Sequence, residues 1–314
     1  MPDWIYRRLG DRLFAALVVF LALGVVAAAL LVALVLYQGS ALAFRTFGFF
    51  GFLTSQAWDA VRGQFGAWPP LAGTLITASA ALLLAFFPAL AAAIYVVEYA
   101  PRWLKEPVAY LIDLLAALPS VVYGLWGLFV LVPPVRDGLE RPLFTWAAVH
   151  APALVPLLGP PTGIGLLSAT LVLALMIVPY ASSLARDALA LVPQSQREAM
   201  FALGATRWEV VRRVVIPYAR AGIFSGVVLA LARALGETMA VTMLIGNAVN
   251  LPYTVFGPAA TMASLIANEF TEADTDLHLS ALIAVGFVLL LLSLLTNLAA
   301  GWMLRRLARG EGRR

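Results

Sequence analysis

The segment that decides the fold of this chain reads Pro193-Gln-Ser-Gln-Arg-Glu-Ala-Met-Phe-Ala-Leu-Gly204-Ala-Thr-Arg-Trp-Glu-Val-Val-Arg-Arg-Val-Val-Ile-Pro217, and it lies between two long apolar stretches. Two Ser/Thr-x-x-Glu spacings predict capping boxes, in which the two side chains bind free backbone N–H groups at a helix start. They are Ser195-x-x-Glu198 and Thr206-x-x-Glu209. Gly204 lies where the first helix needs a left-handed residue in order to end. The segment therefore predicts two short helices joined by a fixed elbow.

The composition indicates an integral membrane protein. Of the 314 residues, 62% are hydrophobic and 12% are charged, whereas a soluble domain carries about 25% charged residues. Apolar runs predict about six transmembrane helices, each close to or above the roughly 20 residues that a bilayer requires. They cover residues 13–37, 71–97, 108–132, 163–187, 217–247 and 278–304. Pro88, Pro119 and Pro179 lie inside these runs and predict kinks, which usually pack around a cavity.

Basic residues are distributed unevenly over the connections between the predicted spans. Sixteen of the 21 Lys and Arg residues lie at the two ends of the chain or in and beside the second and fourth connections. Four lie in the other connections, and Arg233 lies inside a span. The positive-inside rule therefore predicts that both termini and the segment 193–216 face the cytoplasm. The net charge of +4 follows this topology, so it implies no nucleic-acid partner.

A rigid polar segment on one side of a membrane protein offers a contact surface to a soluble partner. Met200, Phe201 and Trp208 are candidate apolar anchors among its charges. The alternative is an amphipathic helix that lies in the membrane interface without a partner.

The sequence excludes several catalytic sites. A phosphate-binding loop needs Gly-Lys-Ser/Thr, and the only lysine, Lys105, stands between Leu104 and Glu106. If ATP drives this protein, another chain must hydrolyse it. His150 and His278 lie in or beside different outward connections with no obvious carboxylate companion, so we expect them to be ordinary interfacial residues. The absence of cysteine removes thiolate sites, and no catalytic or metal spacing stands out, so we expect no enzyme and no metal.

The fifth span carries a pair of charges, Arg233 and Glu237, whose spacing of four residues predicts that they share one helix face. An arginine inside a membrane costs about 2.5 kcal/mol or more on insertion scales, so it should face protein or water and mark a transport path. We expect its guanidinium to meet an anionic substrate, with the carboxylate holding it until the anion arrives. The alternative is a salt bridge that only fixes helix packing. Thr238, Thr242 and Asn247 continue the polar chemistry outward.

The segment 193–217 resembles the coupling loop of ABC-importer permeases, known as the EAA motif. The match consists of Glu198-Ala199, Gly204 six positions after the glutamate, and Val214-Val215-Ile216-Pro217. Met200, Val214 and Ile216 depart from the commonest residues by changes that tolerate the altered volume.

Further strings, from about residue 50 to the last span, resemble the PstC-type permeases of bacterial phosphate importers. They are Phe52-Leu-Thr-Ser-x-x-Trp58-Asp, Phe65-Gly-Ala, Gly73-Thr-Leu-Ile-Thr77, Leu118-Pro-Ser-Val-Val-Tyr-Gly-Leu-Trp-Gly-Leu-Phe-Val-Leu131, Leu203-Gly-Ala-Thr-Arg-Trp-Glu209 and Ala234-Leu-Gly-Glu-Thr-Met-Ala-Val-Thr242. The strings around Pro119 and Gly236 are the specific ones.

This resemblance implies an all-α type I ABC-importer permease in the bacterial inner membrane. It divides the chain into an N-terminal helix with an outward segment (1–70), a permease core (71–305) with coupling helices at about 194–216, and a basic tail (306–314). The implied partners are a homologous PstA-type permease, two PstB-type ATPase subunits that bind ATP and Mg²⁺, and a periplasmic PstS-type phosphate-binding protein. Membrane lipid surrounds the chain, which binds no cofactor of its own. The alternatives are a permease for another oxyanion or small solute, and a membrane enzyme or scaffold.

The resemblance also implies roles for individual residues. The predicted ATPase-coupling residues are Glu198, Ala199, Gly204, Arg207 and Trp208. The predicted substrate path contains Arg233 and Glu237, with Thr238 and Thr242 beside them. Ser120 and Tyr123 follow the Pro119 kink and are weaker candidates for the path, because they could equally form interhelical hydrogen bonds.

Two outward segments are candidates for docking a binding protein. Residues 38–70 contain Trp58, Phe65 and Trp68 as possible anchors, although interfacial aromatics are common in membrane proteins. Residues 253–277 are acidic without a basic residue, and apolar residues at helical spacing predict an amphipathic helix there. They are Met262, Leu265, Ile266 and Phe270. Because acidic groups repel an anion, we expect this segment to contact protein rather than substrate.

Overall fold

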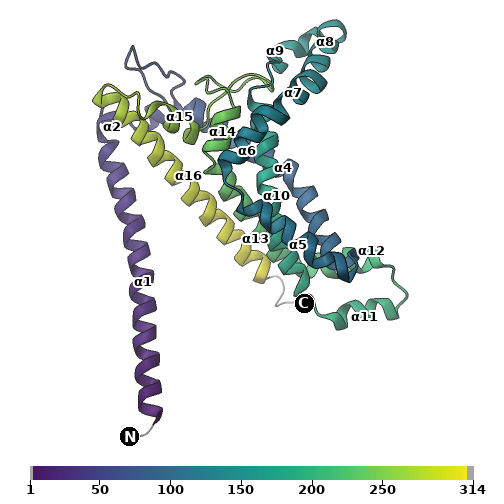
Figure 1. The fold of residues 1–314 in the computed structure, drawn as a ribbon. Coiled ribbons are helices and arrows are strands. Elements are labelled where there is room, and N and C mark those ends of the chain that lie inside the picture. The colour runs from purple at the N-terminus through teal and green to yellow at the C-terminus, as the bar shows by residue number, and fades with distance from the viewer. Residues whose placement is uncertain (1–2, 310–314) are drawn as a thin grey trace.

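The computed structural model describes residues 3–309, which form helices and loops, with no β-strand in this range beyond two isolated bridges (Figure 1). The long helices are α1 (Asp3–Gly39), α4 (Trp68–Ile94), α10 (Leu166–Ala190), α13 (Ile216–Leu235) and α16 (Asp276–Arg309). Five segments are long and apolar enough to cross a membrane: Leu13–Gly39, Trp68–Tyr99, Leu166–Ala190, Arg207–Leu235 and Asp276–Arg306. They correspond to five of the six predicted spans and confirm the all-α membrane fold.

Short helices complete the described chain. At the connections predicted to face outward they are α2 (Ala41–Phe47), α3 (Phe49–Thr54), η4 (Pro152–Leu154), α9 (Val155–Leu158), α14 (Met239–Leu244) and α15 (Met262–Glu269). Elsewhere, the π-helical turn η1 (Tyr95–Tyr99) extends α4, and α11 (Gln194–Ala202) follows α10. The helix α15 confirms the amphipathic helix expected in residues 253–277.

The third predicted span, 108–132, is wrong as one continuous helix. Two helical segments, Arg102–Ala117 and Ser120–His150, meet at an angle of 92°. The first is α5 (Arg102–Ala117). The second contains α6 (Ser120–Trp126), η2 (Gly127–Leu131), α7 (Val132–Val135), η3 (Arg136–Glu140) and α8 (Arg141–His150). Pro119 causes the break, because it disfavours helical geometry at Leu118, whose ψ is 135°. By contrast, α4 and α10 continue through Pro88 and Pro179.

Two tyrosines stabilise this break. The hydroxyl of Tyr123 donates to the carbonyl of Leu115 (2.8 Å), and that of Tyr180 donates to the carbonyl of Ala116 (2.9 Å). Carbonyls at a helix end lack intrahelical partners and are costly to leave unpaired in an apolar layer. The two hydroxyls therefore make an open helix end tolerable inside the bundle.

The fifth predicted span, 217–247, is wrong at both ends. Its helix begins at Arg207, because α12 (Arg207–Val210) and the π-helical turn η5 (Val211–Val215) run directly into α13. It ends at Leu235, and α14 starts separately at Met239. The second of the two predicted short helices is therefore the beginning of a membrane span, and only α11 stands apart.

The helix α10 forms the centre of the bundle, and it packs against α4, α13, α5 and α14. Small residues permit this close packing. A Cβ atom at Gly222 of α13 would lie 2.2 Å from Ala188, and one at Gly226 would lie 3.0 Å from the carbonyl of Ala181. By contrast, the apolar window of α1 is not buried at all, and α1 stands away from the bundle over most of its length (Figure 1).

The ends of the helices fall into two groups (Figure 1). The start of α1, the end of α16 and α11 lie toward the lower end, whereas α2, α8, α9 and α15 lie at the upper end. This agrees with the expectation that both ends of the chain and the polar segment share one side. That this side is the cytoplasm stays a prediction.

Candidate functional site

A charged pair lies where the fifth membrane helix ends. Because α13 stops at Leu235, Glu237 lies beyond the helix, and the predicted shared helix face is wrong. The two side chains still meet, with Nη1 of Arg233 2.5 Å from Oε2 of Glu237. The Glu237 side chain is 1% exposed and that of Arg233 is 32% exposed. The helix break thus buries the carboxylate and leaves the guanidinium partly accessible.

The carboxylate of Glu237 is fixed by the helix that follows. Its Oε1 accepts a hydrogen bond from the backbone N–H of Ala240 (3.2 Å), in the first turn of α14. Its Oε2 is close to Arg233 but is not aligned with an N–H of the guanidinium, so it has no hydrogen-bond partner among residues 3–309. We therefore describe the contact as an ion pair. Apart from this contact, the guanidinium of Arg233 makes no hydrogen bond to the described part of the chain, so its remaining N–H groups can donate to a ligand.

The guanidinium of Arg233 also lies near the break of the third span. Its carbon atom is 6.0 Å from the ring centre of Tyr180, whose hydroxyl caps α5. Six residues further along α10, Arg186 forms an ion pair with Asp113 of α5 (3.1 Å). The sequence reasoning missed these residues. Tyr180, Ser183 and Arg186 are spaced three residues apart, which places them on one helix face. This spacing could have indicated from the sequence that they face the same neighbour.

Thr238 and Thr242, the two threonines predicted for the substrate path, donate their hydroxyl protons to nearby backbone carbonyls. Thr242 donates to the carbonyl of Thr238 (2.7 Å), and Thr238 donates weakly to the carbonyl of Gly236 (3.3 Å). An anion needs donors, so these hydroxyls contribute less to anion binding than Arg233 does. Asn247 likewise donates to the carbonyl of Thr242 (2.8 Å) at a positive φ of 54°. The three side chains stabilise the irregular backbone around α14.

Ser120 and Tyr123, the two path candidates that follow Pro119, lie on α6, which contacts the core near Arg233. Tyr123 is buried in the cluster that contains Ala234 and Ala240. The helix α6 approaches α14 so closely that a Cβ atom on Gly124 would lie 2.6 Å from Sδ of Met243. The structure therefore brings α6 beside the Arg233 region, with Ser120 half-buried at the start of α6.

The two predicted capping boxes differ in outcome. The box at Thr206 and Glu209 is confirmed: the N–H of Thr206 donates to Glu209 (2.9 Å), and that of Glu209 donates to the Thr206 hydroxyl (3.4 Å). The box at Ser195 is wrong, because α11 begins at Gln194 with Pro193 as its N-cap and no side-chain cap. Ser195 therefore lies one residue inside the helix, and Glu198 is exposed.

The elbow between α11 and α12 has the predicted geometry. Gly204 has a φ of +82°, in the left-handed region. The N–H of Gly204 donates to the carbonyl of Phe201 (2.9 Å), and that of Ala205 donates to the carbonyl of Met200 (3.1 Å). These two bonds form the Schellman pattern that ends many helices. The elbow is therefore set by local sequence.

A buried arginine, which the sequence reasoning missed, holds α11 in place. Arg197 forms an ion pair with Glu98 at the end of η1 (2.9 Å), and it donates to the carbonyls of Leu189 (2.9 Å) and Val192. These contacts connect α11 to the ends of two membrane helices. In the sequence, Arg197 does not differ from the exposed arginines that follow it.

The predicted coupling residues form an exposed surface. Glu198, Ala199, Gly204, Arg207 and Trp208 are all exposed. Among the apolar anchors, Phe201 and Trp208 are 45% and 55% exposed. Met200 is partly buried and packs against the cluster of Val210 and Leu189, so it offers less apolar surface than the other two anchors. Leu203, which was not among the predicted anchors, is 83% exposed at the elbow. An apolar group of this kind in a polar surrounding is typical of a protein contact.

At the upper end of the bundle, the structure differs from two expectations. His278 does have a carboxylate companion, because its Nε2 lies 3.0 Å from Oε2 of Glu269, which also accepts from Trp58 (2.8 Å). Phe65 is 1% exposed and stacks on His278, so it cannot anchor a partner. Of the predicted anchors, Trp68 is the most accessible, at 39%. A cavity of about 540 Å³ with acidic walls lies beside this group.

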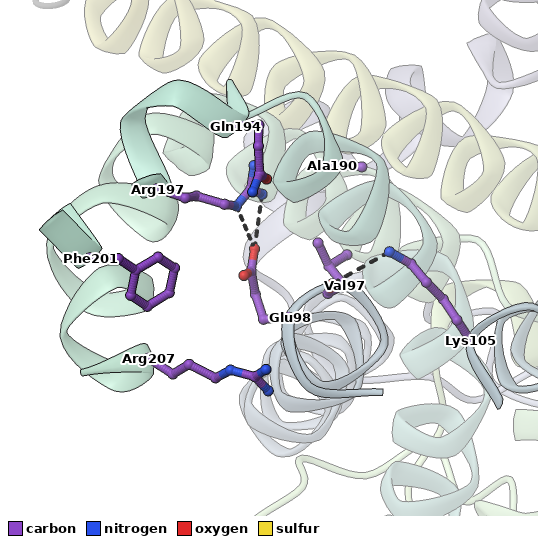
Figure 2. Close-up of a pocket in the computed structure, with 8 residues that line it drawn as sticks. All are labelled: Val97, Glu98, Lys105, Ala190, Gln194, Arg197, Phe201 and Arg207. Carbon is purple, nitrogen blue, oxygen red and sulfur yellow. Dashed lines mark hydrogen bonds and ion pairs between the residues drawn. The ribbon is translucent and has the colours of Figure 1, made fainter. Parts of the chain in front are cut away.

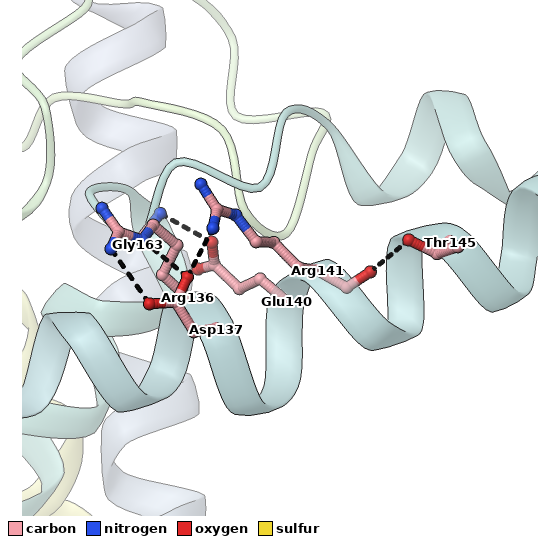
Figure 3. Close-up of polar contacts among 6 residues, drawn as sticks. All are labelled: Arg136, Asp137, Glu140, Arg141, Thr145 and Gly163. Carbon is pink, nitrogen blue, oxygen red and sulfur yellow. Dashed lines mark hydrogen bonds and ion pairs between the residues drawn. The ribbon is translucent and has the colours of Figure 1, made fainter.

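A second polar cluster connects the helical segment α7–η3–α8 to the loop before α10 (Figure 3). Asp137 binds Arg136 (3.0 Å) and Arg141 (2.7 Å) on the surface of this segment. Glu140 is fully buried, and its Oε2 accepts from the N–H of Gly163 (2.7 Å), whose carbonyl accepts from Ser168 (2.6 Å). The continuous helical segment α7–η3–α8 is therefore fixed to the loop that enters α10. These residues were not singled out from the sequence.

Comparisons with known proteins agree with this arrangement. Residues 85–309 match the family described as "Binding-protein-dependent transport system inner membrane component". The phosphate transport system permease protein PstC of Mesorhizobium japonicum is 47% identical over 277 residues, which are 88% of this chain and 84% of that protein. The PstC protein of Pasteurella multocida is 42% identical, with coverage of 96% and 92%.

Solved structures show a similar fold. A chain of a bacterial ABC transporter that imports alginate has a TM-score of 0.55 at 18% identity, with 90% of this chain and 95% of that chain covered. A chain of the MetNI methionine ABC transporter in an inward-facing conformation has a TM-score of 0.53 at 20% identity, with 75% and 93% covered. At these identities the likeness concerns the fold alone.

Proposed function

The chain belongs to the family of binding-protein-dependent transport system inner membrane components, and within it to the PstC-type permeases; on this premise we propose that it conducts phosphate as one permease subunit of an ATP-driven importer. The observation that carries the proposal is the pair Arg233–Glu237 at the end of α13. A cation with free N–H donors, inside an apolar layer and partly accessible, is suited to an oxyanion.

In this proposal the chain supplies half of the path, and a homologous PstA-type permease supplies the other half. Glu237 neutralises Arg233 while the site is empty, so the guanidinium is not left as an isolated charge. Because Ala240 fixes the carboxylate, the guanidinium keeps its position when phosphate arrives. Phosphate then accepts the N–H donors that Glu237 does not use, in charge-assisted hydrogen bonds.

The energy comes from PstB-type ATPase subunits, which bind ATP and Mg²⁺. Two features support this assignment: the chain lacks a Gly-Lys-Ser/Thr sequence, and it exposes Phe201, Leu203 and Trp208 on a rigid elbow. Glu198, Ala199, Gly204 and Arg207 surround these apolar side chains and complete the coupling surface. In this proposal the lower end of the bundle and both termini face the cytoplasm. The upper end receives phosphate from a periplasmic PstS-type binding protein.

The test of the proposed function is reconstitution. The two permeases and the ATPase are placed in vesicles that contain ATP, the phosphate-binding protein is added outside, and uptake of labelled phosphate is followed with and without this chain. We expect uptake only with the chain present, and competition by unlabelled phosphate and its close analogue arsenate but not by sulfate. Equal competition by sulfate would favour the alternative of a permease for oxyanions in general.

A further inference from the structure

A polar cavity of about 360 Å³ lies at the lower end of the bundle, between α11, the end of α10, η1 and the start of α5 (Figure 2). Its walls contain three cations, one carboxylate, one amide and three apolar or small residues. They are Lys105, Arg197, Arg207, Glu98, Gln194, Val97, Ala190 and Phe201.

The charges around the cavity do not cancel. Glu98 is engaged with Arg197. Lys105 makes one long hydrogen bond, to the carbonyl of Val97 (3.4 Å). The side chain of Arg207 is exposed and forms no ion pair or hydrogen bond with any residue whose side chain the structure describes. Figure 2 shows Lys105 and Arg207 extending toward η1 from opposite sides of Glu98. The cavity therefore has an excess of two positive charges, and most of the donors of Lys105 and Arg207 are unused.

We propose that this cavity binds a phosphate-type dianion, either free hydrogen phosphate or a phosphomonoester headgroup such as that of phosphatidic acid. An excess of two charges is matched by a dianion better than by a singly charged group. Guanidinium and ammonium groups on opposite walls suit a tetrahedral anion whose oxygens point in several directions. Gln194 adds neutral donors to the same space.

The proposed site is separate from the substrate path. Arg233 lies near Tyr180 of α10, whereas the cavity is lined by Ala190, ten residues further along the same helix. Ten residues correspond to about 15 Å along a helix axis. An anion in the cavity is therefore not the anion at Arg233.

Occupancy of the cavity acts on α11 through Arg197. This arginine holds α11 against η1, and its main ionic partner is Glu98. An anion in the same cavity competes with Glu98 for the guanidinium and loosens the contact between α11 and η1. If α11 couples to an ATPase, which rests on the proposed function, a phosphate-type anion inside the cell slows import. Binding itself does not depend on that function.

Lys105 offers a direct test of binding, because it is the only lysine in the chain. The full-length chain, within the reconstituted transporter in phosphatidylcholine nanodiscs, is treated with an amine-reactive ester at pH 8. The labelling rate of the peptide that contains Lys105 is then measured by mass spectrometry. Potassium phosphate is compared with potassium chloride at equal ionic strength. At a phosphate concentration ten times its dissociation constant, labelling should slow about tenfold.

Two variants and a second lipid complete the test. Arg207→Gln should abolish the protection, whereas Arg102→Gln, on the same helix as Lys105 but outside the cavity, should preserve it. Nanodiscs with phosphatidic acid and no free phosphate separate the two sources: protection there identifies a headgroup, and protection by free phosphate alone identifies the ion. Equal labelling with phosphate, phosphatidic acid and chloride overturns the proposal. Full protection in Arg207→Gln also overturns it.

The effect on transport is measured separately. Vesicles loaded with phosphate should import labelled phosphate several-fold more slowly than empty vesicles. The ratio of the rate in empty vesicles to the rate in loaded vesicles should fall toward one in Lys105→Gln. Each variant is compared with its own rate in empty vesicles. Protection of Lys105 without any change in this ratio retains the site and overturns its control of α11. Absence of any phosphate import, with Lys105 still protected, contradicts the proposed function and leaves the binding site supported.

Discussion

Replacement of Arg233 by glutamine tests the substrate path most directly. The change removes the positive charge and retains a side chain that can donate a hydrogen bond to Glu237. In wild type, a phosphate oxygen bound to the guanidinium places opposite charges about 4 Å apart, which corresponds to about 4 kcal/mol at an effective dielectric constant of 20. Because the Arg233 side chain is 32% exposed, water screens part of this interaction, so the free energy of the contact between the guanidinium and the anion is about 2–4 kcal/mol.

A loss of about 2–4 kcal/mol corresponds to roughly a 30- to 1000-fold loss of affinity for the anion. In Arg233→Gln, the buried carboxylate of Glu237 also repels phosphate once its partner is gone. Uptake at low phosphate concentration should therefore collapse in reconstituted vesicles. Membrane level and co-purification of the ATPase should persist. Arg62→Gln, which changes an exposed arginine at the outer end, serves as the matched control.

Companion variants separate a substrate role from a structural bridge. Arg233→Lys should retain partial uptake, because it keeps the charge without the planar fork of donors. Glu237→Gln should retain more uptake than Arg233→Gln, because an amide oxygen still accepts from Ala240. The exchange Arg233→Glu with Glu237→Arg should not restore uptake. Near-normal uptake in the exchange variant or in Arg233→Gln would refute the substrate role, and so would equal losses in Arg233→Gln and Glu237→Gln.

Three further predictions concern coupling, assembly and the segment α7–η3–α8. Gly204→Asp should abolish ATPase co-purification and uptake, because it places a negative charge in the proposed contact with the ATPase. The chain should still insert, because nothing lies within 4 Å of a Cβ atom there and the local strain is about 1–2 kcal/mol; Gly204→Asn is the uncharged control, and full uptake in Gly204→Asp contradicts the coupling role. The purified chain alone, or with the ATPase but without the second permease, should show no ATP-dependent uptake; robust uptake by the single chain removes the proposal that it is half of a transporter. Glu140→Ala should destabilise the contact between α7–η3–α8 and the loop before α10 by about 1–3 kcal/mol, because the buried N–H of Gly163 loses its acceptor; this should increase hydrogen exchange at residues 159–165 and leave exchange at α11 unchanged, and equal exchange at 159–165 contradicts the role of Glu140.

The sequence by itself determined the features that depend on composition or on neighbouring residues. Hydropathy located five spans, because a backbone inside a bilayer must satisfy its hydrogen bonds within a helix. Gly204 and the box of Thr206 and Glu209 were also predictable, since a left-handed stop and a cap involve residues only a few positions apart. The charge pair in the fifth span was visible because a charge in an apolar run is costly and rare.

Only the tertiary structure decided where the apolar runs break. Residues 108–132 and 217–247 are predominantly apolar, but hydropathy averages polarity and does not report whether the backbone is continuous. The break after Leu118 is tolerated because Tyr180 arrives from another helix to cap α5. The break after Leu235 turns Glu237 from a neighbour on a helix face into a buried carboxylate held by α14.

Local sequence also does not predict the contacts of side chains whose partners are distant in the chain. Arg197 is buried because Glu98, 99 residues away, lies beside it, and nothing near Arg197 in the sequence indicates this. His278 stacks on Phe65 and binds Glu269, so a predicted surface anchor became part of the core. Local sequence determines caps and hydropathy, whereas burial and ion pairing depend on which helices pack together, and that is a property of the whole chain.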